Sequence, residues 1–140
     1  MPNTEKYLRL LLRIIGASAI LAIVAVIMPH SWLVYWVELA EPGTPVRVLI
    51  PYFARLLSAY YVLLGVLLVF FASDVRRYAP AIRMVAIWCL LTGAAFVTYL
   101  VVALPWSQWT GFVWFVFSDA TFGVVFAVAT LVLGRRISAE

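Results

Sequence analysis

Few side chains in this chain could do chemistry, and Asp119 is the most unusual of them. It lies within the last of four hydrophobic segments, in the stretch Phe112-Val-Trp-Phe-Val-Phe-Ser-Asp-Ala-Thr-Phe-Gly-Val-Val-Phe126. An ionised carboxylate at the centre of a membrane helix costs roughly 2.5–3.5 kcal/mol on insertion scales. A residue retained at that cost indicates either a structural partner or a functional site.

Arg55 is the candidate partner of Asp119. At 1.5 Å per residue, the predicted topology puts Arg55 roughly 5–8 Å and Asp119 roughly 11–13 Å below the outer membrane boundary. An arginine side chain can span that difference, and pairing lowers the cost of carrying both charges in lipid. Helical periodicity adds Ser58 and Tyr99 to this outer-leaflet group, whereas Ser118 points elsewhere. Three interpretations stay open: an ion pair that fixes helix register, a ligand pocket, or a charge that faces a partner subunit.

The other reactive residue types are too scarce to form a catalytic or metal-binding set. The chain has one histidine, His30, and one cysteine, Cys89. This excludes a bis-histidine haem site and a disulfide within the chain, and the sequence indicates no Ser-His-Asp set. No second carboxylate lies at the depth of Asp119, so the sequence predicts no catalytic residue and favours a protein that is not an enzyme. It identifies no cofactor, and contact with a quinone, a lipid or a pigment stays open.

Composition indicates one integral membrane domain that covers residues 1–140. Of the 140 residues, 66% are hydrophobic and 11% are charged, and the mean hydropathy is +1.08. Soluble domains average about 45–50% apolar and about 25% charged residues. The net charge of +4 is spread along the ends of the hydrophobic segments, which argues against a nucleic-acid partner.

The hydrophobic segments predict an all-α, four-helix transmembrane bundle. Each has about the 20 residues that a helix needs to cross the hydrocarbon core, and a lone strand could not satisfy its backbone there. Prolines fall at the segment ends, where they do not break helical hydrogen bonds. The predicted spans are residues 7–28, 52–72, 84–104 and 112–133, and the prolines are Pro29, Pro51, Pro80 and Pro105.

The basic residues predict the orientation. With four crossings, eight of them fall on one side and only Arg47 and Arg55 on the other, so both termini should be cytoplasmic. The location that this predicts is the bacterial inner membrane, crossed several times. The first span should be a retained helix, since no convincing signal-peptide cleavage site follows it. The eight residues are Lys6, Arg9, Arg13, Arg76, Arg77, Arg83, Arg135 and Arg136.

Aromatic residues gather where the chain should meet the outer interface. Residues 31–40 predict a short interfacial helix, which Pro42-Gly43 would end. Its aromatic side chains, with two tryptophans after the third span, form either an aromatic belt or a docking surface for a partner protein. Glycines in the spans should let neighbouring helices approach closely. The aromatic residues are Trp32, Tyr35, Trp36, Trp106 and Trp109, and the glycines are Gly16, Gly65, Gly93 and Gly123.

Two short stretches give the chain a family resemblance. Arg55-Leu-Leu-Ser-Ala-Tyr-Tyr-Val-Leu-Leu-Gly65 and Asp119-Ala-Thr-Phe-Gly123 resemble small bacterial DoxX-like four-helix membrane proteins of uncharacterised function. The resemblance implies the same four-helix fold, and DoxX itself is associated with a quinone-linked oxidoreductase as a membrane subunit. No residue pattern here carries that activity over, and many relatives have glutamate where this chain has Asp119. The acid among phenylalanines is also similar in kind to sterol-isomerase and sigma-receptor-like pockets, which use more than one acid or a histidine.

Two functional hypotheses follow from these patterns. The first is a non-catalytic accessory or assembly subunit of a larger bacterial membrane complex, respiratory or photosynthetic, with membrane lipids and other membrane subunits as partners. The alternative is a protein that binds a lipophilic molecule, a quinone or sterol-like lipid, in an outer-leaflet pocket. An enzyme that acts on such a molecule is the less favoured form of this alternative. In that pocket the ligand-binding residues would be Arg55, Ser58, Tyr99 and Asp119.

Overall fold

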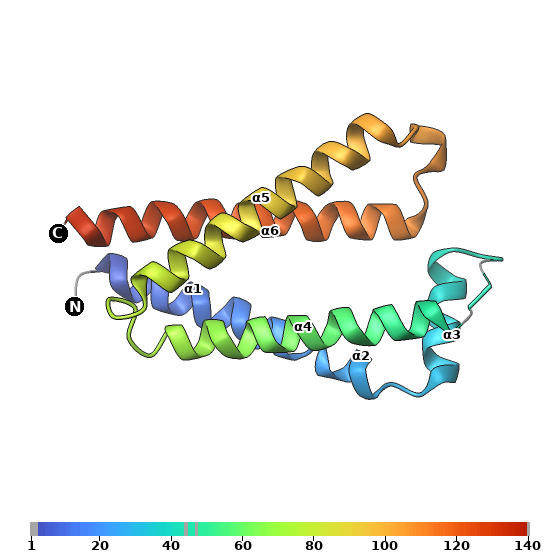
Figure 1. The fold of residues 1–140 in the computed structure, drawn as a ribbon, viewed down its shortest axis with the longest axis horizontal. Coiled ribbons are helices and arrows are strands. Elements are labelled where there is room, and N and C mark those ends of the chain that lie inside the picture. Colours follow the sequence, from blue (N-terminus) through green and yellow to red (C-terminus); the bar gives the residue numbers. More distant parts are fainter. Residues whose placement is uncertain (1–2, 44, 47, 140) are drawn as a thin grey trace. The chain divides into compact units, whose positions relative to one another are not determined.

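Every regular element in the described part of the chain is helical. The computed structural model describes residues 3–43, 45–46 and 48–139, so Arg47 lies outside the described residues. Four stretches are long and apolar enough to cross a membrane: Asn3–Ile27, Leu49–Phe71, Ala79–Ala103 and Gly111–Ile137. The all-α fold class with four spanning helices is therefore confirmed. The elements are α1 (Asn3–Ile20), α2 (Ile23–Ile27), α3 (His30–Ala40), α4 (Leu49–Phe71), α5 (Ala79–Ala103), η1 (Trp106–Gln108) and α6 (Gly111–Ala139) (Figure 1).

Prolines mark the helix starts, but two helices begin earlier than the sequence predicts. Pro51 lies in the first turn of α4 and Pro80 is the second residue of α5. The first backbone N–H groups of a helix have no acceptor within it, so a proline fits there without losing a hydrogen bond. At the other end of the chain, α6 continues past Gly134 through Arg135 and Arg136 to Ala139. Cations in the last turn interact favourably with the negative end of the helix dipole.

The first span is broken rather than continuous. The helix α1 ends at Ile20 and α2 begins at Ile23, with a turn between them. Around the break, backbone N–H groups bond to the carbonyl three residues earlier, including Leu21 to Ser18 at 3.2 Å and Ala22 to Ala19 at 3.1 Å. Such bonds tighten the helix locally while keeping its backbone satisfied in lipid.

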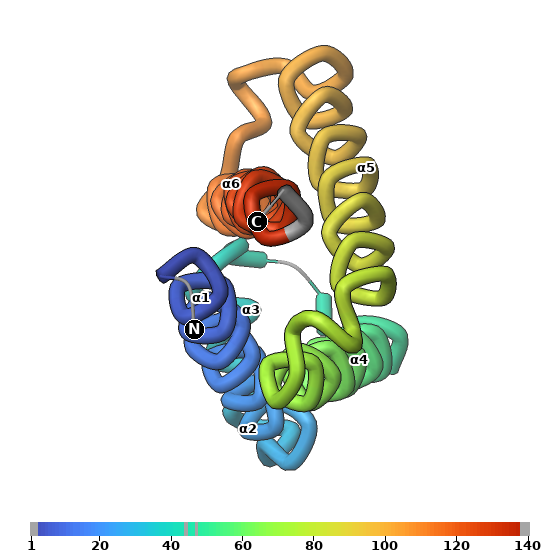
Figure 2. The backbone as a smooth tube through the Cα atoms, turned by 90° about the vertical axis from the view of Figure 1, so that its left-hand side faces the viewer, coloured from blue at the N-terminus to red at the C-terminus, as the bar shows by residue number. Residues whose placement is uncertain are grey.

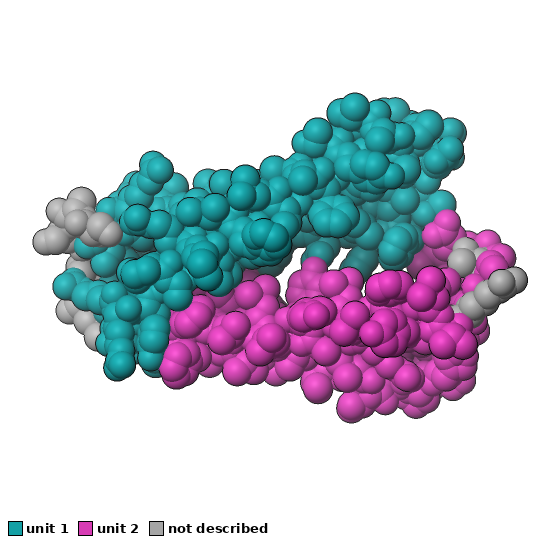
Figure 3. Space-filling view, viewed as in Figure 1, with its two compact units in different colours: residues 1–11, 73–140 teal, residues 12–72 magenta. Residues whose placement is uncertain are grey.

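The chain divides into two compact units (Figure 3). Unit 1 comprises Met1–Leu11 and Ser73–Glu140, and unit 2 comprises Leu12–Ala72. A single integral membrane domain over residues 1–140 stays a prediction. In unit 1, Leu8 of α1 lines the same cavity as Gly134 and Ile137 of α6, so both ends of the chain lie at one end of this unit. That arrangement agrees with an even number of crossings.

In unit 1, α5 and α6 cross near their middles through Gly93 (Figures 1 and 2). A methyl group added at Gly93 would lie 2.9 Å from the carbonyl oxygen of Ala120 and 2.9 Å from Cγ2 of Val124. The missing side chain is therefore what lets the two backbones approach. By contrast, the space around Gly123 is open within 4 Å, so the prediction of close packing there is wrong.

In unit 2, α1 and α4 cross through a pair of glycines. A methyl group at Gly65 would lie 2.6 Å from the carbonyl oxygen of Gly16, and one at Gly16 would lie 2.8 Å from that of Gly65. Both distances are to backbone atoms, which cannot rotate away as a side chain can. The crossing therefore requires glycine on both helices, as the small residues of the first span predict.

Candidate functional site

Asp119 lies on the exposed surface of α6. Its neighbours at helical spacing, Phe115 and Phe122, are 70% and 53% exposed. Further along the same stripe of the helix, Phe126 is only 6% exposed and Thr130 only 2%. One face of α6 is therefore buried toward its C-terminal half and exposed around Asp119, where a carboxylate stands among aromatic rings.

The hydroxyl groups near Asp119 are satisfied within their own helices. Ser118 donates a hydrogen bond to the carbonyl of Trp114 at 2.9 Å, and Thr121 donates one to Phe117 at 2.8 Å. On α5, Thr92 does the same with Trp88 at 2.8 Å. Such back-bonding is how a hydroxyl is carried in an apolar environment. These three residues need no ligand to satisfy them.

Arg55 is half-buried on α4 and binds the corner between α2 and α3. Its Nη2 donates a hydrogen bond of 3.1 Å to the carbonyl oxygen of Met28, the residue that caps α2. Its Nε is buried with no hydrogen-bond partner among the described residues. An open groove of about 590 Å³ beside it is lined by Arg55, His30, Tyr52 and other residues of unit 2. Arg55 is thus both a structural residue and part of that groove's lining, together with His30.

The four predicted ligand-binding residues fall two in each unit. Arg55 and Ser58 lie on α4 in unit 2, both half-buried. Tyr99 on α5 and Asp119 on α6 belong to unit 1, and both are exposed. The pairing of Arg55 with Asp119 stays a prediction.

The aromatic residues predicted for an interface are largely exposed. On α3, Trp32, Tyr35 and Trp36 are exposed, and the rings of Tyr35 and Trp36 meet edge to face at 5.7 Å. After α5, the rings of Trp106 and Trp109 stack at 4.5 Å. Trp109 also contacts residues of α6, at 4.8 Å from Trp114 and 5.4 Å from Phe117. The second group is therefore a cluster of four rings that connects the segment after α5 to α6, whereas the sequence predicts only two separate interfacial tryptophans.

Sequence reasoning missed the ion-pair group at the N-terminal end of unit 1. Glu5 is 6% exposed, and its two carboxylate oxygens accept hydrogen bonds from Arg9 at 3.2 Å and Arg76 at 3.1 Å. The spacing of Glu5 and Arg9, four residues on a helix, is a signal that could have found the first pair. No local pattern could have found Arg76, which is 71 residues away in the chain. The group anchors the linker between α4 and α5 to α1.

Among the described residues, no group of three or more His, Cys, Asp or Glu side chains lies together as a metal site would require. Comparisons with protein-family models, curated proteins and solved structures found no match to this chain. The resemblance to DoxX-like proteins thus stays an interpretation of two short stretches of sequence. What is shown is the class: a multi-pass membrane protein with four spanning helices.

Proposed function

We propose that this chain is a non-catalytic accessory or assembly subunit of a larger membrane complex in the bacterial inner membrane. The observation that carries the proposal is the exposed aromatic face of the spanning helix α6 around Asp119, where Phe115 and Phe122 are 70% and 53% exposed. We propose that a transmembrane helix of a partner protein covers this face, Asp119 included.

The energetics favour a covered face. A helix packed on this face shields its polar side chains from the acyl chains, where an ionised carboxylate costs roughly 2.5–3.5 kcal/mol. Hydrogen bonds between membrane helices are each worth about 0.6–2 kcal/mol. The neighbouring rings of Phe115 and Phe122 are exposed and supply the apolar contact area that helix packing needs.

The burial pattern along α6 supports the same proposal. The stripe that contains Asp119 continues into Phe126 and Thr130, which are buried within the chain. Gly123 leaves open space beside Asp119, because nothing lies within 4 Å of where its Cβ would be. A small residue next to a polar one is typical of a face against which another helix packs closely.

Crosslinking in native membranes tests the proposal. A photoreactive residue would replace Phe122, and as a control Val128, which lies about 180° around the helix from Asp119 at 100° per residue and is also exposed. We expect the Phe122 position to crosslink to one partner protein, and the Val128 position to miss it. Asp119→Asn, which keeps the size of the side chain, should lower that crosslink about fivefold or more, equivalent to about 1 kcal/mol.

Three outcomes would contradict the proposed function. A crosslink only to a second copy of this chain would indicate a homo-oligomer, and crosslinks to lipid alone would indicate that the face stands in the bilayer. Recovery of the partner unchanged by Asp119→Asn would show that the carboxylate plays no part in the contact.

A second candidate function is supported by the groove at Arg55. Its lining combines apolar residues, including Leu56, with the polar groups of His30, Tyr52 and Arg55. An apolar cleft with a few positioned polar groups is typical of sites for lipophilic ligands, here a quinone or sterol-like lipid on the side predicted to be outer. Retention of such a molecule through purification, and its loss in Arg55→Met, would favour this candidate over the first.

A further inference from the structure

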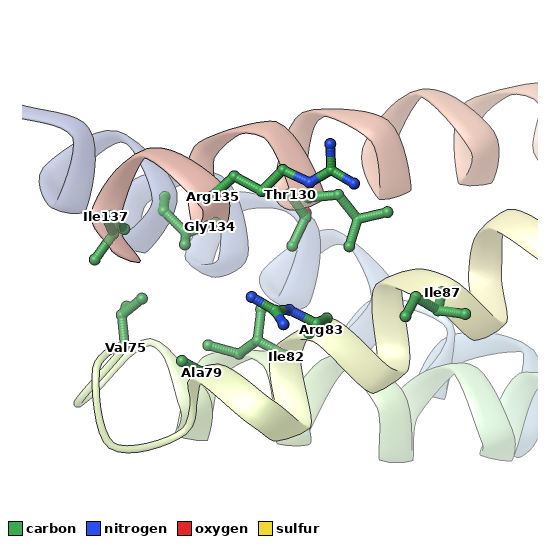
Figure 4. A pocket seen from close by; sticks show the side chains of 11 residues that line it. Val75, Ala79, Ile82, Arg83, Ile87, Thr130, Gly134, Arg135 and Ile137 are labelled. Atoms are coloured by element: carbon green, nitrogen blue, oxygen red, sulfur yellow. The ribbon is translucent and has the colours of Figure 1, made fainter. Parts of the chain in front are cut away.

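A second cavity lies in unit 1, at the end that carries both chain termini. It has a volume of about 240 Å³ and is formed by the first turns of α5 and the last turns of α6, with Leu8 of α1 (Figure 4). Apolar side chains, including Ile82 and Ile87 of α5, make up much of its lining. By the predicted topology, this end faces the cytoplasm, so the cavity opens where lipid headgroups lie.

Two arginines line this cavity, and no carboxylate does. Arg83 reaches from α5 into the space between the helices, and the side chain of Arg135 runs along α6 (Figure 4). Both are exposed, and neither side chain makes a hydrogen bond or an ion pair with a described residue. Arg9 and Arg76, at the same end of unit 1, are instead paired with Glu5. The charge of the cavity is therefore positive and not neutralised by the described residues.

A buried hydroxyl also lines the cavity without a partner. Thr130 is 2% exposed, and its Oγ1 has no hydrogen-bond partner among the described residues. This differs from Ser118 and Thr121 on the same helix, whose hydroxyls donate to carbonyl groups four residues earlier. A buried polar atom that misses even this local bond points to a polar group supplied from outside the chain.

We propose that this cavity binds the headgroup of an anionic phospholipid from the inner leaflet. Arg83 and Arg135 would bind the phosphate, because guanidinium groups form charge-assisted hydrogen bonds with phosphate oxygens. The hydroxyl of Thr130 would bond to an oxygen of the glycerol ester region, and the acyl chains would leave along the apolar wall at Ile82 and Ile87. Basic pockets between membrane helices on the cytoplasmic side are sites of this kind.

Native mass spectrometry of the intact detergent-purified chain tests this site. The protein would be offered an equimolar mixture of phosphatidylglycerol and phosphatidylcholine, and the retained lipid would be weighed. We expect the wild type to retain phosphatidylglycerol preferentially. Because both guanidinium groups would lose their charge-assisted hydrogen bonds to the phosphate, R83Q/R135Q should reduce the preference about tenfold or more.

Arg136 provides the matched control. It is the next residue along α6, is also exposed, and is absent from the lining of the cavity. R136Q should leave the preference within about twofold of the wild type, because a guanidinium outside the cavity makes no hydrogen bond to the bound phosphate. If R136Q loses as much as R83Q/R135Q, the preference reflects diffuse charge and the site is refuted.

Two further measurements distinguish lipid binding from the binding of soluble phosphate and from misfolding of the variants. Inorganic phosphate, added as a competitor, should not displace the lipid, because it has no chains for the apolar wall; displacement at similar concentration would assign the site to a soluble phosphate. R83K/R135K keeps both charges and should retain most of the preference. A lysine variant that folds yet loses the preference as fully as the glutamine variant would overturn the role of charge. Absence of any preference in the wild type would overturn the proposal.

Discussion

The guanidinium of Arg55 donates a hydrogen bond of 3.1 Å from Nη2 to the carbonyl oxygen of Met28. Met28 caps α2, where the last carbonyl groups of the helix have no hydrogen-bond donor within it. In an apolar environment an unsatisfied carbonyl costs several kcal/mol, so a cation that bonds it stabilises the corner between α2 and α3. Arg55 therefore has a structural role inside unit 2, whatever it does toward other parts of the molecule.

The first prediction concerns this bond. Arg55→Met keeps much of the side-chain stem but removes every donor, so it should lower the free energy of unfolding by about 1.5 kcal/mol or more, as expected for a hydrogen bond to a charged group. Denaturation with sodium dodecyl sulfate, followed by tryptophan fluorescence, measures the change. Arg13→Gln, an exposed arginine in the same unit, is the control and should shift the stability by less than about 0.5 kcal/mol. Equal stability of Arg55→Met and the wild type would show that the Met28 carbonyl is satisfied in another way.

The second prediction separates the two roles open to Asp119. If a partner helix covers Asp119, as proposed, then Arg55→Met and Asp119→Asn should act independently in the isolated chain. Their double-mutant cycle should give a coupling energy below about 0.5 kcal/mol, which is the usual limit for residues that do not interact. A coupling well above about 1 kcal/mol would instead establish the internal ion pair and leave the proposed interface without its charge.

Hydropathy and proline placement predict the spanning helices because both act locally. A run of about 20 apolar residues must form a helix in lipid, and a proline in the first turn costs nothing there. The break at Leu21–Ala22 escapes such reasoning, since that segment contains only good membrane residues. The end of α6 escapes it too, because the arginines after Leu133 leave the apolar run but not the helix.

For the candidate sites too, the sequence predicts only what depends on a local segment. The carboxylate of Asp119 is conspicuous in the sequence because its cost depends on its own segment. The cavity at Arg83, Thr130 and Arg135 combines residues from opposite ends of α5 and α6, and each of them is ordinary when taken alone. Likewise, no pattern distinguishes Gly93, which meets a backbone, from Gly123, which meets open space. Contacts between segments that are distant in the sequence determine which residues line a cavity and which glycine lies at a helix crossing.

The third prediction uses those glycines. Gly65→Ala and Gly93→Ala should each lower the free energy of unfolding by about 1–3 kcal/mol, because the added methyl group meets a backbone carbonyl within 3 Å. Gly123→Ala provides the matched control on α6, where the same methyl group meets nothing and alanine favours the helix by about 0.8–1 kcal/mol. We expect it to be neutral or stabilising in the isolated chain. Loss of stability in Gly123→Ala would show that the space beside it is filled.

The fourth prediction concerns Glu5, which is nearly buried between Arg9 and Arg76. Glu5→Gln removes the charge that both arginines contact, so it should cost about 1–2 kcal/mol, more than an exposed ion pair and less than a fully buried one. Lys6→Gln, at the exposed neighbouring position, should change stability by less than about 0.5 kcal/mol. Because Arg76 lies in the linker to α5, limited proteolysis of residues 73–78 should also accelerate in Glu5→Gln. Proteolysis at the wild-type rate would show that other contacts hold the linker.

The fifth prediction tests whether the buried hydroxyl of Thr130 forms a hydrogen bond to a bound lipid. In detergent without phospholipid, Thr130→Val removes a buried oxygen that has no described partner, and should stabilise the chain by about 1 kcal/mol. With phosphatidylglycerol present, the wild type gains a bond that the valine variant cannot form, so the difference should shrink or reverse. Thr121→Val is the control, since its hydroxyl already bonds to Phe117 and its effect should not depend on lipid. If the two variants respond to lipid alike, the oxygen of Thr130 does not contact the bound lipid, and the proposed role of its hydroxyl is refuted.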